Sequence, residues 1–189
     1  MLFHHTELPG ALVITPEPIA DERGSFFENL RTEALSEAIG RPFRPQQINY
    51  SVSRRNTLRG LHGVRNPPGQ AKYVTCVRGA LRDIMVDLRL GSPAYGRYVV
   101  TELTAAEGTA LYIPEGFGHG FLSLAEDTCI SYVLGTAHVP GTQIDINPLD
   151  PELDLPWGFD SFPLISPKDA AAPSLAEVRD QGLLLQFPG

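Results

Sequence analysis

The chain is a succession of short apolar, β-branched or aromatic runs that are interrupted by glycine and proline. These two residues are frequent, with 18 Gly and 17 Pro in 189 residues. Short apolar runs between turn residues are typical of a β-sandwich or a closed antiparallel barrel. The predicted strands are residues 11–13, 47–52, 72–78, 81–88, 96–103, 109–113, 120–124 and 129–134. We therefore predict an all-β fold, a jelly roll or antiparallel β-barrel.

Helical signals are confined to two short segments. Residues 32–39 and 174–180 have helical patterns, and a glycine that favours a helix end follows each of them, Gly40 and Gly182. Residues 78–80, Arg-Gly-Ala, join two predicted strands and are expected to form a tight hairpin.

The length of the chain favours one domain that covers residues 1–189. At 20.6 kDa the protein is large enough to bury a core without disulfides or metals. It contains no internal repeat and no low-complexity linker. The segment after Pro140 is irregular and rich in proline, and we expect it to wrap around the barrel and bring residues 166–169 back to it.

The charge balance argues against nucleic acid as a partner, because the net charge is −7. Basic residues are nevertheless gathered in one part of the chain. They are Arg54, Arg55, Arg59, Arg65, Lys72, Arg78 and Arg82. Such a patch suits a small anionic ligand, and it is equally compatible with a plain solvated face.

Two cysteines, Cys76 and Cys129, lie within apolar runs and are expected to be reduced, buried thiols. The sequence has no charged-then-apolar leader and no apolar run of membrane-spanning length. We therefore predict a cytoplasmic protein without a membrane partner.

Residues 108–119 carry the most specific motif, Gly-x5-Pro-x-Gly-x2-His. This pattern resembles the second half of the signature of cupin barrels, and the predicted fold is therefore a cupin-type jelly roll. In metal-binding cupins, a first half of the signature supplies two His and a Glu, which join the later His around one ion.

The first half of the signature is altered here. His62 is kept, Val64 stands at the second His position, and Lys72 is the simplest match to the carboxylate position. A divalent metal needs about three neutral or anionic protein ligands, and an ammonium group repels it. We predict a barrel mouth that holds His62, His119 and Lys72 with no metal and no other cofactor.

Three of these residues have possible chemical roles, each beside a structural alternative. His62 is a natural general base near pH 7, or a histidine bonded to a backbone carbonyl. His119 lies between two glycines that permit close approach of a ligand, with the same alternative. Lys72, if it points into the barrel, would be stabilised by an anion such as an enolate; otherwise it lies on the outer face.

Four further residues are ambiguous when each is considered alone. Considered alone, Tyr132 is more often a core aromatic residue, and Asp169 is a candidate helix N-cap. Arg23 lies in a turn before two phenylalanines, and Arg59 lies close to His62. Two guanidinium groups are well suited to a diphosphate, although a single Arg is more often a surface residue.

Many motifs, in the same order along the chain, resemble the dTDP-4-keto-6-deoxyhexose epimerases, of which the dTDP-4-dehydrorhamnose 3,5-epimerases are the best known. They are Asp-Glu-Arg-Gly-x-Phe-x-Glu at 21–28, Gln-x-Asn-x-Ser at 47–51, Leu-Arg-Gly-Leu-His at 58–62, Pro-Gly-Gln-Ala-Lys at 68–72, Val-Arg-Gly-x3-Asp-x3-Asp-Leu-Arg at 77–89, Gly-Ser-Pro-x-Tyr-Gly at 91–96, Pro-x-Gly-x2-His-Gly-Phe at 114–121, Tyr132 and Ser-x-Lys-Asp at 166–169. The resemblance extends from residue 2 to about residue 177.

The resemblance implies a homodimeric, metal-free jelly roll that epimerises the sugar carbons next to a 4-keto group. It implies that His62 is the base that removes the α proton and that Asp169 orients it. Tyr132 would return a proton to the other face of the enolate. Lys72 would stabilise the enolate oxygen, and His119 would contact the sugar.

The resemblance also implies a nucleotide-sugar substrate, a dTDP-4-keto-6-deoxyhexose, held by a further set of residues, some of them across the dimer interface. These substrate-binding residues are Arg23, Phe26, Glu28, Gln47, Asn49, Arg59, Gln143 and Lys168.

The sequence departs from the family pattern at residues 136–143, Thr-Ala-His-Val-Pro-Gly-Thr-Gln. Family members commonly have an aromatic-rich segment and then a Glu in this region. The stacking ring is missing or replaced by His138, and the carboxylate position is Gln143. Residues 147–151, Asn-Pro-Leu-Asp-Pro, resemble the branch that makes unusual deoxysugars for secondary metabolites.

These observations favour a 3- and/or 5-epimerase that acts through an enolate. The alternatives are a single-carbon epimerase of a secondary-metabolite pathway, a 4-keto sugar isomerase, a metal-dependent cupin dioxygenase and a catalytically silent sugar-nucleotide-binding cupin. The dioxygenase is disfavoured by Val64 and Lys72, and the silent cupin by the joint presence of His62, Tyr132 and Asp169.

Overall fold

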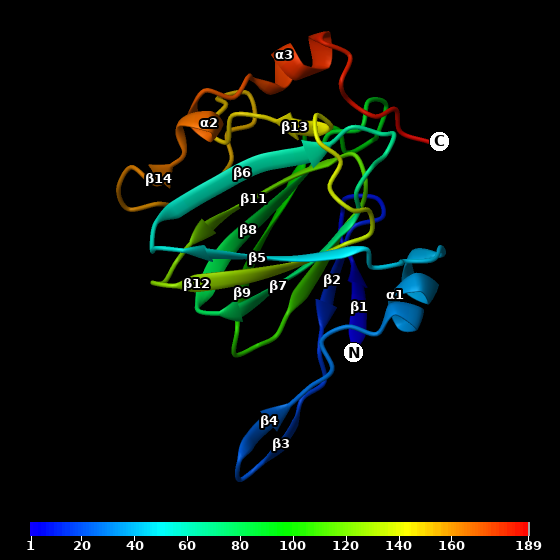
Figure 1. Cartoon of the computed structure of the whole chain (residues 1–189), viewed down its shortest axis with the longest axis vertical. Coiled ribbons are helices and arrows are strands. Elements are labelled where there is room, and N and C mark those ends of the chain that lie inside the picture. The colour runs from blue at the N-terminus through cyan, green and yellow to red at the C-terminus, as the bar shows by residue number, and fades with distance from the viewer. Residues whose placement is uncertain (189) are drawn as a thin grey trace.

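The computed structural model describes residues 1–188 and contains two antiparallel sheets that lie face to face (Figure 1). The first sheet has the order β1 (Leu2–His5), β2 (Leu12–Thr15), β10 (Ala110–Ile113), β7 (Lys72–Arg78), β12 (Thr128–Leu134) and β5 (Gln47–Ser53). The second has the order β13 (Gln143–Asp145), β6 (Thr57–Val64), β11 (Phe117–Ser123), β8 (Ala80–Asp87) and β9 (Tyr98–Thr104). This architecture confirms the predicted cupin-type jelly roll.

The remaining elements are short. Strand β14 (Leu164–Ile165) pairs in parallel with β6, and β3 (Ile19–Asp21) forms a separate hairpin with β4 (Gly24–Phe26). This hairpin extends away from the two sheets (Figure 1). The helices are α1 (Thr32–Ile39), α2 (Pro167–Ala170) and α3 (Leu175–Asp180).

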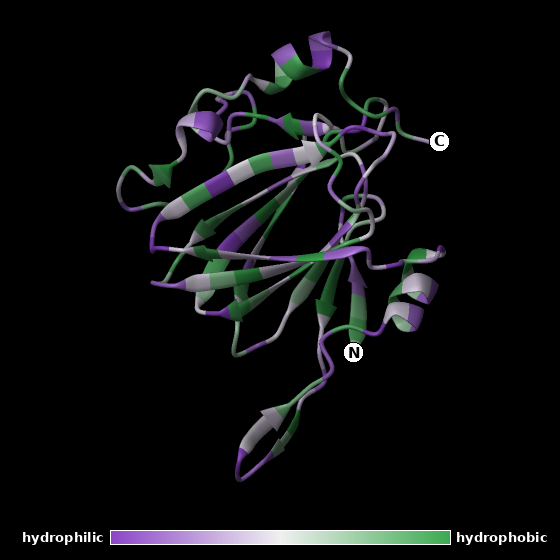
Figure 2. Cartoon of the chain, in the orientation of Figure 1, coloured by the Kyte–Doolittle hydropathy of each residue, from purple (hydrophilic) through white to green (hydrophobic). Residues whose placement is uncertain are grey.

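The inner core lies between the two sheets and is formed by side chains from facing strands. Val74 and Ile130 of the first sheet belong to the same buried cluster as Met85, Leu103 and Phe121 of the second. Apolar residues recur along the strands of both sheets (Figure 2). Complete burial of each such side chain stabilises the fold by about 1.5–3 kcal/mol.

A second core lies on the outer face of the second sheet. Ile84 and Val86 of β8 belong to the same buried cluster as Trp157, Leu175 and Val178 of the C-terminal segment. Strand β8 is therefore buried on both faces, which explains its imperfect polar–apolar alternation. The predicted return of the C-terminal segment to the barrel is confirmed, because β13 and β14 both pair with β6.

The two predicted helices are confirmed. Helix α1 has the predicted bounds, and Gly40 ends it in the left-handed conformation. Helix α3 begins one residue later than predicted, because Ser174 is its N-cap and forms a reciprocal capping box with Glu177. In α2 the N-cap is Ser166, so the interpretation of Asp169 as an N-cap is wrong; Asp169 lies in the first turn.

The hairpin predicted at residues 78–80 is wrong. Strand β7 pairs with β10 and β12, whereas β8 pairs with β9 and β11, so the turn carries the chain from one sheet to the other. Gly79 has a positive φ of 78° in this turn. A Cβ atom added there would lie 2.8 Å from Thr128 Oγ1.

Neither cysteine forms a disulfide: Cys76 is buried and Cys129 is half-buried. Within residues 1–188, no helix has the length and apolar character needed to cross a membrane.

The turn between the sheets yields a stability prediction. Gly79→Ala should lower the free energy of unfolding by about 2–4 kcal/mol, because it combines a strained φ with a clash against Thr128. Gly91→Ala is the matched control, since Gly91 has a similar φ of 83° and no atom within 4 Å of the added Cβ. It should cost only about 1–2 kcal/mol. Urea unfolding measures both, and equal losses would contradict the steric argument.

Candidate functional site

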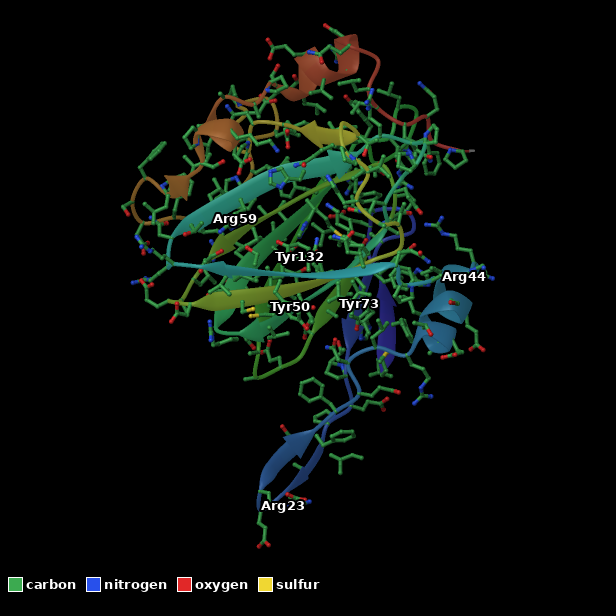
Figure 3. All side chains as sticks on the ribbon, in the orientation of Figure 1. Arg23, Arg44, Tyr50, Arg59, Tyr73 and Tyr132 are labelled. Carbon is green, nitrogen blue, oxygen red and sulfur yellow. The ribbon has the colours of Figure 1, made fainter. Side chains whose placement is uncertain are left out.

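A cavity of about 480 Å³ opens between the two sheets and gathers most of the predicted site residues. Strands β5, β6, β7, β11 and β12 line it together with the segment that precedes β13. Figure 3 shows Arg59 and Tyr132 on strands of opposite sheets. The predicted residues that line the cavity are Gln47, Asn49, Arg59, His62, Lys72, His119, Tyr132 and Gln143.

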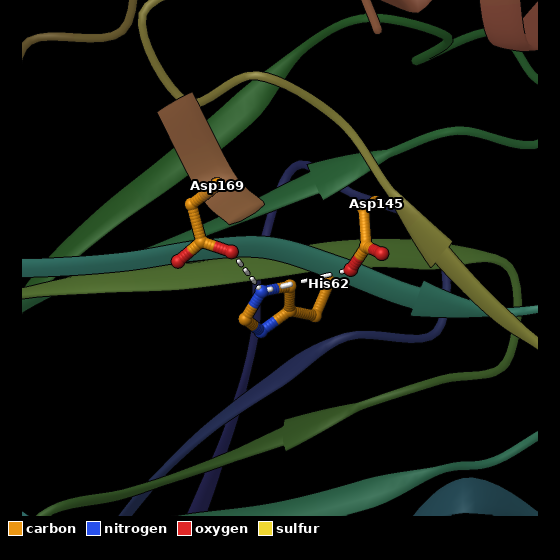
Figure 4. Close-up of side chains that lie close together, drawn as sticks. All are labelled: His62, Asp145 and Asp169. Carbon is orange, nitrogen blue, oxygen red and sulfur yellow. Dashed lines mark hydrogen bonds and ion pairs between the residues drawn. The ribbon is translucent and has the colours of Figure 1, made fainter. Parts of the chain in front are cut away.

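His62 lies within strand β6. Its strand neighbours are His119 on β11 and Asp145 on β13, which places the three residues in one row across the sheet. The ring Nε2 of His62 is 2.8 Å from Asp169 Oδ1. The other ring nitrogen, Nδ1, points away from the carboxylates (Figure 4).

Helix α2 holds the Asp169 carboxylate in place. The backbone N–H of Asp169 donates to Ser166 Oγ at 3.0 Å, and its Oδ2 accepts the backbone N–H of Gly60 at 3.4 Å. Burial alone would raise the pKa of Asp169, but its hydrogen bond with His62 and the charge of His62 lower that pKa below its usual value. Asp169 is therefore an ionised acceptor at neutral pH, which fixes the tautomer and orientation of His62.

Lys72 points into the cavity, so the outer-face alternative is wrong. Its side chain is buried, and Nζ donates to the backbone carbonyl of His62 at 3.0 Å. Burial lowers the pKa of Lys72 to about 8, and the charge of Asp83 opposes this effect. A cation in this position is available to a developing oxyanion at neutral pH.

A second histidine–carboxylate pair lies deeper in the cavity. His119 Nε2 is 2.7 Å from Asp83 Oδ2, and Asp83 is fully buried. Among the described residues, Asp83 Oδ1 has no hydrogen-bond partner. In the sequence, Asp83 is recognisable only as part of the motif at residues 77–89. A further signal is its spacing, because residues two apart in a strand share one face, and Asp83 therefore lies on the same face as the apolar residues Leu81 and Met85.

Tyr132 is a core aromatic residue that also lines the cavity. Its ring packs edge-on against His119, with the ring centroids 5.9 Å apart. Burial, with a smaller contribution from Asp83, raises the pKa of Tyr132 far above its ordinary value. The phenol therefore keeps its proton at neutral pH. It reaches the cavity from the first sheet, whereas His62 reaches it from the second.

Polar residues of β5 and β6 also line the cavity. Arg59 Nε donates to Ser53 Oγ at 3.0 Å. Gln47 Nε2 donates to Asn49 Oδ1 at 2.8 Å, and Gln47 Oε1 accepts the backbone N–H of His138 at 2.9 Å. These contacts connect the divergent segment 136–143 directly to the cavity.

Five predicted site residues are not among those that line the cavity: Asp169, which contacts the lining residue His62, and four others. Arg23 and Phe26 lie on the β3–β4 hairpin, where Arg23 pairs with Asp21. Figure 3 shows Arg23 at the far end of this hairpin. Glu28 pairs with Arg31, and Lys168 pairs with Asp145 at 2.9 Å.

His62, Asp145 and Asp169 each offer one donor atom within 4.8 Å of the others, a spacing that a metal ion could bridge. These atoms already interact with one another and with the chain. Asp169 Oδ1 bonds to His62, and Asp145 Oδ1 accepts bonds from Lys168 and from Gln143. An ammonium group 2.9 Å from one of the carboxylates disfavours a divalent cation there.

Comparison with known proteins identifies the family. The family model described as dTDP-4-dehydrorhamnose 3,5-epimerase matches residues 5–177. A relative from Streptomyces niveus named dTDP-4-dehydrorhamnose 3-epimerase is 48% identical over 177 residues, which are 94% of this chain and 85% of the relative. The chain belongs to the dTDP-4-dehydrorhamnose 3,5-epimerase family.

Solved structures of this epimerase family have the same fold. NovW, a 4-keto-6-deoxy sugar epimerase from the novobiocin cluster of Streptomyces spheroides, is 46% identical with a TM-score of 0.95, covering 99% of this chain and 94% of NovW. ChmJ, a 3′-monoepimerase from Streptomyces bikiniensis solved with dTDP-quinovose, is 41% identical with a TM-score of 0.92, covering 97% and 92%. The family named from sequence motifs is therefore confirmed, and the chain is an enzyme of the isomerase class.

The buried charges of the cavity give a direct prediction. Because burial lowers the pKa of Lys72 to about 8, its ε-carbon NMR signal should titrate near pH 8, with the ammonium form below that pH. Asp83→Asn should move the midpoint to lower pH, since the Asp83 charge favours the ammonium. Glu102→Gln on the neighbouring strand, which removes a carboxylate paired with Arg82, should leave it in place. A midpoint unchanged by Asp83→Asn would show that the two groups are not coupled.

Proposed function

We propose that this protein epimerises a dTDP-4-keto-6-deoxyhexose at C3, C5 or both, through an enolate and without a metal or other cofactor. One observation carries the proposal: a histidine–carboxylate pair and a protonated phenol reach the same cavity from opposite sheets. Inversion at a carbon requires that a proton leave one face and another proton arrive at the opposite face. A base and an acid on opposite walls meet that requirement.

The proposed reaction begins with proton abstraction next to the ketone. His62 takes the α proton on Nδ1, and Asp169 stabilises the resulting imidazolium through its hydrogen bond to Nε2. The electron pair of the broken C–H bond forms the C=C bond of the enolate, and the negative charge moves to O4. The ammonium of Lys72 stabilises that oxyanion.

Reprotonation completes the inversion. Tyr132 delivers its phenolic proton to the other face of the enolate carbon, and the carbonyl re-forms. Burial keeps this proton on Tyr132 until a strongly basic carbon is present. His119, held by Asp83, is placed to contact the sugar beside Tyr132. Arg59, Gln47 and Asn49 are the cavity groups available to the nucleotide diphosphate.

The support for C3 as a reacting carbon is stronger than for C5. The Streptomyces niveus relative is named as a 3-epimerase, and the Streptomyces bikiniensis structure is described as a 3′-monoepimerase. The family model is described as a 3,5-epimerase. We therefore propose inversion at C3 and leave inversion at C5 as the outcome that the exchange experiment decides.

We also propose a homodimer, on the basis of strand β5. Gln47, Asn49 and Ser51 of this edge strand line the cavity, and the residues that alternate with them, Ile48, Tyr50 and Val52, are 56%, 66% and 53% exposed. Tyr50 also borders the cavity. An apolar stripe on an exposed edge strand favours association with another chain. In such a dimer the β3–β4 hairpin would bring Arg23, Phe26 and Glu28 to the neighbouring cavity.

The reaction is tested by incubation with dTDP-4-keto-6-deoxyglucose in deuterium oxide, followed by proton NMR. Deuterium should enter at C3, and His62→Ala should abolish exchange because no base remains. Tyr132→Phe should slow product formation more than about 100-fold while leaving substrate binding nearly unchanged.

Several outcomes would contradict this assignment. Exchange at the wild-type rate in His62→Ala would reject His62 as the base, and full epimerisation by Tyr132→Phe would reject Tyr132 as the acid. A product with a displaced carbonyl would identify a 4-keto sugar isomerase in place of an epimerase. Binding without exchange would indicate a silent binding protein.

The dimer is tested by sedimentation velocity. The double variant Ile48→Glu/Val52→Glu should shift the protein from dimer to monomer, because two buried charges would have to be desolvated at the interface. Val100→Glu, at a partly exposed position on β9, is the control and should remain dimeric. A monomeric wild-type protein would overturn the proposal.

A further inference from the structure

Asp145 is a second carboxylate that faces the proposed base. Its Oδ1 lies 3.7 Å from His62 Nε2, the same nitrogen that Asp169 approaches at 2.8 Å (Figure 4). The two carboxylates come from different elements, Asp145 from β13 and Asp169 from α2. The strand register accounts for the proximity, because Asp145 is the direct partner of His62 and cross-strand partners share one face of a sheet.

The position of Asp145 is fixed by two donors. Lys168 Nζ donates to its Oδ1 at 2.9 Å and Gln143 Nε2 donates at 2.7 Å. Both bonds end on the oxygen that faces His62. Gln143 is the position at which the family pattern has a carboxylate, and a carboxylate there would lack the donor and repel Asp145. The amide of Gln143 therefore supports the carboxylate of Asp145, which a second carboxylate at position 143 would not do.

The ion pair with Lys168 moderates the charge of Asp145. The Asp145 side chain is 23% exposed, whereas that of Lys168 is 58% exposed. Lys168 therefore lies on the solvent side of the pair, and its ammonium partly offsets the negative charge that acts on His62. Asp169, Lys72 on β7 and His119 on β11 contact or neighbour His62. Arg59, Tyr132 and His138 line the same cavity.

We propose that Asp145 is a second positioning residue for His62, and that its ion pair with Lys168 sets how strongly the Asp145 charge acts on the His62 ring. With Asp169, it stabilises the imidazolium that forms when His62 takes a proton. Asp145 does not contact the reacting carbon; it acts through His62. The inference rests on the proposed function for its catalytic consequence, but the coupling between Asp145, Lys168 and His62 is a property of the free protein.

The first test is a titration of the His62 ring by ¹⁵N NMR in the ligand-free protein. Asp145→Asn should lower the midpoint by about 0.5–1 pH unit, since removal of a negative charge disfavours the imidazolium. Lys168→Met should raise it, since the same negative charge is no longer offset. In the double variant, Lys168→Met should have a smaller effect than in the wild-type background.

The second test measures catalysis. Asp145→Asn should reduce kcat for deuterium exchange by about 3- to 10-fold, and the acid limb of kcat/KM against pH should move to lower pH. Asp180→Asn is the control, because it removes a carboxylate from the exposed pair with Arg179, outside the cavity. It should change neither the titration nor the rate.

The outcomes separate the two proposals. An unchanged His62 midpoint in both single variants, with the fold intact by amide NMR, would overturn the role of Asp145. Absence of exchange in the wild-type protein would overturn the proposed function. The titration would still decide whether Asp145 acts on His62. A uniform loss of rate without any movement of the pH profile or the midpoint would show a purely structural role for Asp145 and would also reject the proposal.

Discussion

The hydrogen bond between His62 and Asp169 depends on the way the C-terminal segment closes over strand β6. Strand β13 pairs with one edge of β6, β14 pairs with its beginning, and α2 follows directly after β14. The buried side chains of Trp157, Leu175 and Val178 hold this segment against the outer face of the second sheet. The apolar contacts that cover the sheet therefore also bring both carboxylates, Asp145 and Asp169, to His62.

The cavity places several charged or polar groups in a poorly solvated space. A fully buried carboxylate such as Asp83 is costly unless opposite charge and hydrogen bonds compensate for the lost water. His119 supplies a hydrogen bond, and Lys72 supplies opposite charge nearby. The same arrangement leaves Lys72 with a pKa of about 8. Lys72, whose burial is costly for its charged form, is the group that the proposed mechanism assigns to the enolate oxygen.

Much of the fold could be predicted from local sequence because the longer strands are rich in apolar, β-branched or aromatic residues. Strand β7 has the predicted bounds, and α1 does too. Strand β6 was missed because Gly60 and Gly63 interrupt it; an added Cβ at Gly60 would lie 2.6 Å from the Cα of Gly120 on β11, so close approach of the strands requires glycine there. The crossing at Gly79 was misread as a hairpin, because local sequence does not say which sheet the next strand joins.

The residues of the candidate site that could be predicted are those with a local sequence signal. His62, Lys72, His119 and Tyr132 carry motifs, and the structure places all four around one cavity. Asp145 lies in the alternating run 143–146, which marks a strand, but its importance comes from register with β6, and register is a property of the folded sheet.

In a barrel with facing sheets, a group that removes a proton and a group that returns one can lie on opposite walls of the cavity, as inversion at a carbon requires. His62 and Asp145 belong to the second sheet and Asp169 belongs to helix α2, whereas Lys72 and Tyr132 belong to the first sheet. In the proposed mechanism, the carbon that lies between His62 and Tyr132 would be set by the tilt of the sugar and not by the identity of those two groups. His138, Val139 and Gln143 line the same cavity and belong to the segment that departs from the family pattern. Differences in reacting carbon should therefore map to this segment, while the base, acid and oxyanion groups stay the same.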